Sequence, residues 1–289
     1  MSSGMFLGLG SAVGFGVADV SGAVSAKKLG VPVTVFIIQS FNVVMLSLLL
    51  LTPIPGALSA GRGAVVAIAA SGLLGTLSFF SFYRALQLGP VSVVSPVFAS
   101  YAALTVVLSV ALNGEHLSGL AALGVSSTIA GVVLASSRSS RDRGDDASRA
   151  GIPFALVATL SWGVASYLIG RYSQQVGWYL PLFGSRLVEF ACMATILIVL
   201  RARGATVVFP RGRFALIPAV SGLADNIAVG AFARGSQLGF ISITSAVSAT
   251  FPLVVIAGGV ILFHERPTKR QWTGVVLTIA GLVVLGLSR

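Results

Sequence analysis

Four ionisable residues lie inside long apolar runs of the sequence, where a charged group needs a chemical reason to be present. They are Asp19, Arg186, Glu189 and Asp225. An ionisable side chain at the centre of a membrane costs about 2.5–3.5 kcal/mol on insertion scales, and such residues commonly bind protons, ions or substrates. Their types suggest proton exchange at a carboxyl group and recognition of a small charged ligand.

Asp19 is the candidate proton-coupling residue. It lies eight residues before Lys27, about 12 Å along a helix, which is too deep for its short side chain to reach water. An apolar setting favours the neutral form of a carboxyl group, so Asp19 could exchange protons near neutral pH. The alternative is a permanent ion pair with a basic group such as Arg84 or Arg186.

Arg186 and Glu189 have a spacing of three residues, so they share one face of a helix. The simplest interpretation is a salt bridge within that helix. The alternative is that Arg186 receives an anionic group of a substrate, such as a carboxylate, through two parallel hydrogen bonds. Gln39 and Asn42 have the same spacing in the first half of the chain, and we expect both pairs to face a common cavity.

Asp225 and Asn226 form a further candidate substrate-binding pair. Asp225 lies about 11 residues into its apolar run, close to the midplane by helical rise, and the alternative is a helix-capping or water-binding role. Tyr101, Trp162 and Tyr167 lie in or beside runs that should line the same cavity. Their rings could stack on a planar ligand, whereas interfacial anchoring or packing is the alternative for each.

Composition identifies the elements that must position these residues. The chain has 289 residues, of which 55% are hydrophobic and 9% charged, and a mean hydropathy of +0.96. Soluble domains carry about 25% charged residues, so soluble enzymes, secreted disulfide scaffolds and disordered proteins are excluded. The net charge of +11 comes from basic residues scattered over many loops, which argues against nucleic-acid binding. The sequence predicts an all-α integral membrane protein.

Ten apolar segments fit between the glycine, proline and charged breaks, because each span needs about 20 residues. We place them at 5–24, 32–51, 64–86, 91–112, 119–136, 152–170, 180–200, 214–234, 240–262 and 270–287. The long polar stretch at 137–150 is predicted to be a linker between two five-helix units at 1–136 and 151–289.

The two units repeat each other in sequence. At an offset of 150, residues 84–89 (RALQLG) align with 234–239 (RGSQLG), and Gly75 aligns with Asp225; at 147, Gln39 aligns with Arg186, Asn42 with Glu189 and Asp19 with Ser166. Five spans are an odd number, so the second unit must enter the membrane upside down. Such inverted repeats place a binding site near the midplane and expose it alternately to each side. Asp19 and Asp225 break this symmetry.

Several motifs resemble a known family. Residues 86–90 (LQLGP), 114–118 (GEHLS) and 130–134 (AGVVL), repeated as 264–268 (HERPT) and 280–283 (AGLV), resemble the EamA-type ten-helix members of the drug/metabolite transporter superfamily. The resemblance covers nearly the whole chain. It implies a cofactor-free transporter whose relatives export amino acids and other metabolites, or carry sugars, nucleotide sugars and cationic drugs.

The first span carries a second resemblance. Residues 18–22 (ADVSG), followed by Lys27, are similar to the first helix of the small multidrug resistance proteins. That resemblance implies that Asp19 binds protons and substrate in competition. Ser166 stands at the equivalent place in the second half, so the carboxylate pair of those relatives is broken here.

The sequence therefore predicts a secondary transporter in the bacterial inner membrane, exporting a small metabolite such as an amino acid by alternating access, in exchange for protons. The alternatives are a multidrug cation exporter and a lipid-carrier flippase. An intramembrane enzyme is disfavoured, because neither His116 nor His264 has nucleophile or metal-ligand company. The expected partners are the bilayer, a small-molecule substrate and protons, and the chain could be a monomer or a homodimer.

Two further expectations concern the loops. Glu115 and Glu265 each precede a predicted N-cap, Ser118 or Thr268, and we interpret them as structural groups at the starts of their own spans. Fourteen of the 19 basic residues fall after the odd-numbered spans and four on the opposite side, which favours termini outside the cell. The family resemblance implies termini inside.

Overall fold

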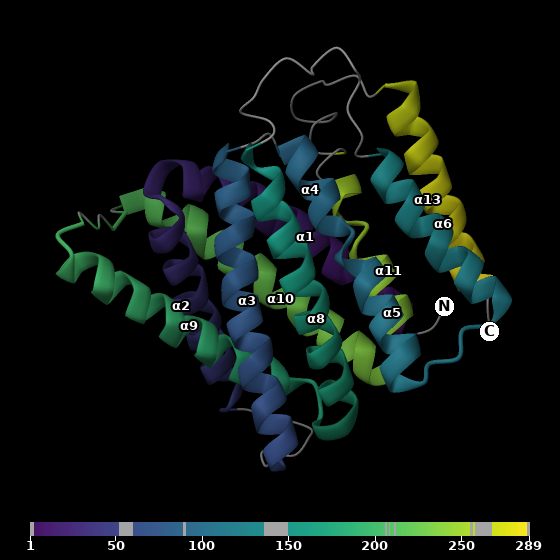
Figure 1. Ribbon diagram of the computed structural model, residues 1–289, viewed down its shortest axis with the longest axis horizontal. Coiled ribbons are helices and arrows are strands. Elements are labelled where there is room, and N and C mark those ends of the chain that lie inside the picture. Colours follow the sequence, from purple (N-terminus) through teal and green to yellow (C-terminus); the bar gives the residue numbers. More distant parts are fainter. Residues whose placement is uncertain are drawn as a thin grey trace.

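The computed structural model describes residues 3–51, 60–88, 91–135, 150–205, 207, 209–210, 212–254, 257 and 268–287 (Figure 1). Six of the described helices are long and apolar enough to cross a membrane. They are α1 (Ser3–Leu29), α2 (Val31–Leu49), α3 (Arg62–Leu88), α8 (Ile152–Val176), α9 (Tyr179–Ala202) and α10 (Leu216–Leu238). The regular structure of the described part is helical throughout.

Shorter helices complete the two halves. They are α4 (Val91–Ala99), α5 (Tyr101–Asn113), α6 (Gly119–Ala135), the 3₁₀ turn η2 (Gly212–Ala215), α11 (Ile241–Ser248) and α13 (Lys269–Leu287). The predicted linker lies, apart from Ala150, outside the described residues. We call the side where α6 ends and α8 begins the linker face, and the side where α1 begins and α13 ends the terminal face.

The fourth and ninth predicted spans are not continuous helices. A turn at Ser100 separates α4 from α5, and α11 ends just before a turn at residues 249–250. At both places a side-chain hydroxyl donates a hydrogen bond to a backbone carbonyl three residues earlier. Ser100 Oγ donates to Val97 O at 2.6 Å, and Thr250 Oγ1 donates to Val247 O at 2.7 Å. Such bonding bends helices. The hydrophobic pattern alone does not reveal these turns.

The two halves pack against each other in opposite directions. Gly4 of α1 lies against the end of α10 at Gly235, whereas Gly14 lies against Ala224 near the start of α10. The pair α6 and α13 is also antiparallel. There Gly131 approaches the backbone of Thr278, and Gly281 approaches the backbone of Thr128, which is the same contact displaced by 150 residues. The packing therefore has an approximate two-fold relation with one half inverted.

Candidate functional site

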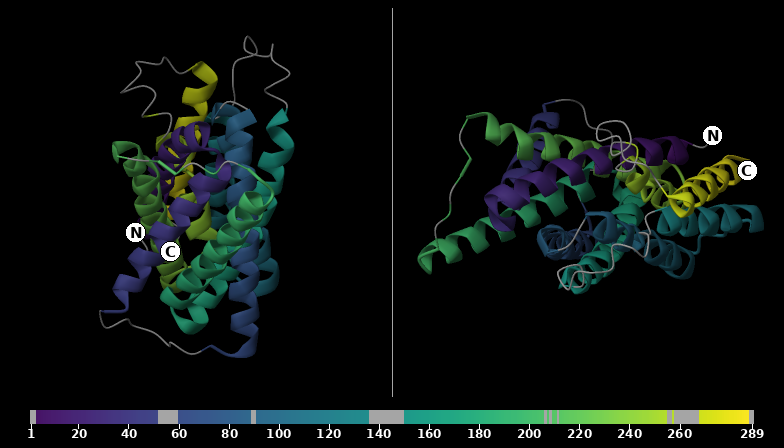
Figure 2. Two further views of the ribbon diagram at one scale, coloured as in Figure 1. Left: turned by 90° about the vertical axis from the view of Figure 1, so that its left-hand side faces the viewer. Right: turned by 90° about the horizontal axis from the view of Figure 1, so that it is seen from above.

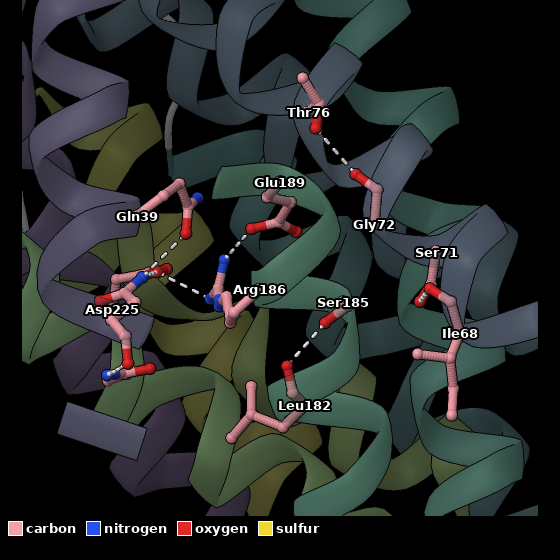
Figure 3. A network of polar contacts seen from close by, with 12 residues as sticks. Gln39, Ile68, Ser71, Gly72, Thr76, Leu182, Ser185, Arg186, Glu189 and Asp225 are labelled. Atoms are coloured by element: carbon pink, nitrogen blue, oxygen red, sulfur yellow. Dashed lines mark hydrogen bonds and ion pairs between the residues drawn. The ribbon is translucent and has the colours of Figure 1, made fainter. Parts of the chain in front are cut away.

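A buried ion-pair network connects α2, α9 and α10 (Figure 3). Arg186 donates from Nη1 to Glu189 Oε2 and from Nη2 to Asp225 Oδ2, each at 2.7 Å. Asn42 donates to the same Asp225 oxygen at 2.8 Å and to Gln39 Oε1 at 3.2 Å. These five residues are 0–2% exposed. The structure thus brings both sequence pairs and Asp225 to one place.

The repeat explains why these residues meet. Position 72 of α3 packs against Ser185 O and Val188 of α9, and position 222 of α10 packs against Ile38 O and Phe41 of α2. Both positions are glycines, which permit the close approach of the neighbouring helix. The pairs α3–α9 and α2–α10 are therefore equivalent, and the polar residues lie one turn further along each.

One turn further, the two halves differ in chemistry. In one helix pair Asp225 meets Asn42, whereas in the other Gly75 faces Glu189, whose Oε1 occupies the place that a side chain at Gly75 would take. The glycine at position 75 leaves room for the Glu189 carboxylate, and the aspartate at the equivalent position 225 supplies a second carboxylate. Both carboxylates therefore reach Arg186. The asymmetry that the sequence shows at position 225 thus creates the network.

The network uses the two terminal nitrogens of Arg186. Each terminal nitrogen donates to one carboxylate and has a second N–H group, because a guanidinium carries five N–H donors. The remaining nitrogen, Nε, has no hydrogen-bond partner among the described residues. The salt bridge within α9 that the spacing indicated is present.

Asp19 lies apart from these hydrogen bonds. It is 6% exposed, and its Oδ2 has no hydrogen-bond partner in the described part of the chain. The alternative pairing with Arg84 or Arg186 is wrong in this structure, because Arg84 donates to Gln87 and Arg186 binds the other carboxylates. The hydroxyl of Tyr83 fills the space beside Gly22, one turn from Asp19.

Other buried polar atoms around the network also lack partners within the described residues. They are Gln39 Nε2, Asn42 Oδ1 and Asn226 Oδ1, in addition to Arg186 Nε and Asp19 Oδ2. Asn226 itself is 9% exposed and donates to Asn42 O at 3.2 Å. Buried polar groups in proteins are nearly always satisfied by protein, water or ligand. This set comprises two donors and three acceptors.

Aromatic rings connect the network to the centre of the bundle. The Arg186 guanidinium lies 5.3 Å from the ring centroid of Phe79, which in turn makes an edge contact with Trp162 at 5.6 Å. Trp162 contacts the rings of Phe15 and Tyr101, at 6.1 and 6.4 Å. Tyr101 also donates to Ser248 Oγ at 3.4 Å, beside the turn after α11.

Phe79 and Phe15 were not among the predicted site residues. Phe15 stands 147 residues before Trp162, so the repeat offset could have indicated it, whereas nothing in the sequence marks Phe79. Tyr167 is 5% exposed on α8, and no described contact joins it to the network. Of the three predicted aromatics, the structure therefore connects Tyr101 and Trp162 to the Arg186 region.

Glu115 caps a different helix from the one that the sequence predicted. Its carboxylate accepts the backbone N–H groups of Ile241, at 2.7 Å, and Ser242, at 3.1 Å, together with the hydroxyl of Ser242. Glu115 therefore caps α11 of the other repeat and not its own span, for which Ser118 accepts Ala121 N. The expected helix was wrong because a capping partner from another repeat is invisible to local spacing. Glu265 lies outside the described residues.

We predict that Glu115→Ala exposes the first turn of α11. The amides of Ile241 and Ser242 precede the first intrahelical bond, Thr244 N to Phe240 O, so their hydrogen bonds come from Glu115 alone. Hydrogen exchange of a peptide covering these amides should be roughly ten-fold faster or more, because bonds to a charged acceptor contribute about 1.5–3 kcal/mol. Glu115→Gln should give an intermediate rate, and an unchanged rate in both variants would contradict the capping role.

Comparisons with known proteins agree with this architecture. The model of the EamA-like transporter family matches residues 2–137 and 149–287, once for each half. The chain belongs to this family. The EamA resemblance, the all-α membrane fold and its two inverted five-helix repeats are therefore confirmed, and this EamA protein is a multi-pass membrane transporter.

Solved structures support the fold as well. A chain whose title reads only "Crystal structure of protein" is 21% identical to this EamA protein, with a TM-score of 0.76. The match covers 99% of this chain and 96% of that one. At this identity the likeness concerns the fold alone. A comparison with curated proteins finds no match.

Proposed function

We propose that this EamA protein is a secondary transporter that exports a small zwitterionic metabolite, such as an amino acid, by alternating access. The observation that carries the proposal is the set of unpartnered buried atoms around Arg186. Two donors, Arg186 Nε and Gln39 Nε2, suit a carboxylate. Three acceptors, on Asn42, Asn226 and Asp19, suit an ammonium group.

Proton coupling at Asp19 is part of this proposal. Asp19, Glu189, Asp225 and Arg186 are all buried, so these four groups together carry a formal charge of −2 when all are ionised. Uncompensated charge is costly in a low-dielectric interior. A proton on Asp19 would reduce that cost, and a ligand ammonium group would compete with the proton for the same carboxylate.

A multidrug cation exporter is the second candidate, and the same charge excess favours it. Because Arg186 is already bound to two carboxylates, a cationic ligand need not meet a free positive charge at this site. The two candidates differ in whether the ligand must carry a carboxylate. We place the protein in the bacterial inner membrane in either case.

The test is transport in sealed liposomes that contain a pH-sensitive dye, with no imposed pH gradient. Amino acids, their decarboxylated amines and cationic drugs are added one class at a time. Proton flux evoked by amino acids but not by the amines supports the zwitterion proposal, and the reverse supports the cation exporter. Radiolabelled ligand that equilibrates without proton flux indicates a facilitator. Silence in both readouts would overturn both candidates and favour a lipid carrier.

We predict that Asp19→Asn reduces the ligand-evoked proton flux about ten-fold or more, while the protein remains folded. Asparagine has nearly the same shape but cannot exchange a proton, and Asp19 makes no ion pair in the described structure. Asp19→Glu, which keeps the carboxyl group, is the matched control and should retain coupling. Unchanged proton flux in Asp19→Asn would remove Asp19 from the proton pathway.

A further inference from the structure

A cavity of about 770 Å³ lies on the linker face, away from the Arg186 network. The ends of α1 and α9, the start of α10 and the chain that joins α9 to α10 line it. Figures 1 and 2 show this joining chain at one edge of the molecule, where α9 and α10 diverge. None of the network residues lines this cavity, so it requires its own explanation.

Two cations of the cavity lie against aromatic rings. Lys28 Nζ is 4.9 Å from the ring centroid of Phe214, and Arg201 Cζ is 5.9 Å from that of Phe209. The lining contains no acidic residue, and neither cation forms an ion pair within the described part of the chain. The described carboxylates, on Asp19, Glu115, Glu189 and Asp225, are all buried elsewhere.

The helix C-termini of α1 and α9 do not by themselves explain why Lys28 and Arg201 line this cavity. A positive side chain near a helix C-terminus is stabilised by the helix dipole, and Lys27 and Arg203 already stand at the same two ends. All four cations are exposed, but Lys27 and Arg203 do not line the cavity. What distinguishes Lys28 and Arg201 is that both line one cavity and that each lies beside an aromatic ring.

The remaining lining indicates an apolar body on the ligand. Phe209, Pro210, Phe214 and Ile217 line the cavity together with Leu29 and Val207. Beyond the cavity, α10 continues with apolar side chains at Leu216, Val220 and Leu223, which are 45–63% exposed and repeat every three to four residues. This stripe is typical of a lipid-facing helix surface.

We propose that this cavity is a binding site for an amphipathic anion. Its phosphate or carboxylate group lies between Lys28 and Arg201, and its apolar body packs on Phe209, Phe214 and Ile217. A membrane lipid with an anionic headgroup and a soluble amphipathic anion present the same chemistry to the site. The continuity with the exposed stripe on α10 favours the lipid as the source.

The test is native mass spectrometry of the full-length protein in detergent, titrated with phosphatidylglycerol, phosphatidylcholine of the same acyl chains, and octyl phosphate. The variant Lys28→Gln/Arg201→Gln removes both cavity cations. The matched control, Lys27→Gln/Arg203→Gln, removes two cations from the same helix ends outside the cavity. A cation near an anionic headgroup contributes about five-fold in affinity, so the cavity variant should bind phosphatidylglycerol about 25-fold more weakly than the control.

The outcomes separate the two sources. Preference for phosphatidylglycerol over phosphatidylcholine that is lost only in the cavity variant supports a lipid site. Octyl phosphate binding with the same variant dependence, without a phosphatidylglycerol preference, supports a site for a soluble anion. Equal binding by the cavity variant and its control would overturn the proposal. Because binding is measured without transport, the result does not depend on the proposed function.

Discussion

Replacing Arg186 with leucine is expected to abolish transport and to reduce the free energy of unfolding by about 3–5 kcal/mol. The substitution leaves Glu189 and Asp225 buried without their shared counter-charge, and breaking a buried pair by removing one partner has an effect of this size. Both contacts are 2.7 Å long and the side chains are 1–3% exposed, so water cannot easily replace the guanidinium. Unfolding in mixed micelles of increasing SDS content measures the stability.

Matched variants separate the structural and functional roles of Arg186. In Arg186→Leu/Glu189→Gln/Asp225→Asn the orphaned charges are gone, so most of the stability should return because the cost came from unpaired carboxylates. Transport should not return, since the donor for a ligand carboxylate is still missing. Arg186→Lys keeps the charge but not the planar fork that binds two carboxylates at once, and should be intermediate. Full transport by the triple variant would contradict a role for Arg186 in substrate binding.

The sequence predicted most of the network because its information is local and periodic. A spacing of three residues places Gln39 with Asn42 and Arg186 with Glu189 on one helix face. The repeat offset then predicts that both faces meet, and the structure brings them together. Only the recognition that the halves are inverted was needed beyond the spacing itself.

What the sequence could not predict depends on contacts between distant segments. Glu115 caps a helix that begins 126 residues later, and no local pattern encodes that partner. Phe79 reaches Arg186 through packing of α3 on α9, and an apolar residue in an apolar span has no distinguishing signal. The bends at Ser100 and Thr250 arise from hydroxyls that could equally have bonded elsewhere.

The two equivalent helix pairs are not equally close. A Cβ at Gly72 would stand 2.6 Å from Val188 Cβ and 2.7 Å from Ser185 O, whereas a Cβ at Gly222 would stand 3.2 Å from both Ile38 O and Phe41 Cβ. Position 72 therefore has no room for a methyl group, and position 222 has slightly more. In an inverted repeat the alternate state follows when the two halves exchange conformations. We expect the α2–α10 pair to close there and the α3–α9 pair to loosen.

Gly72→Ala should therefore shift the protein away from the arrangement described here, and Gly222→Ala should shift it toward that arrangement. Overpacking of this kind costs about 1–3 kcal/mol, which corresponds to about a 5- to 150-fold change in the ratio of the two states. Because transport needs both states, each variant should also transport more slowly. Gly230→Ala is the control, since its Cβ would meet its neighbours at ordinary contact distances of 3.7 Å or more.

Double electron–electron resonance between spin labels at positions 27 and 203 measures this shift between the two states. The labels are introduced in a Cys192→Ser background, which removes the single cysteine. These positions stand at the ends of α1 and α9 on the linker face. The distance distributions of Gly72→Ala and Gly222→Ala should change in opposite directions from the parent, and Gly230→Ala should match it. Changes in the same direction would mean that the difference between the two glycine contacts is local packing. Opposite changes would show that both halves use these contacts to exchange states. The Arg186 network lies one turn away from the contacts, so each exchange would then alter it.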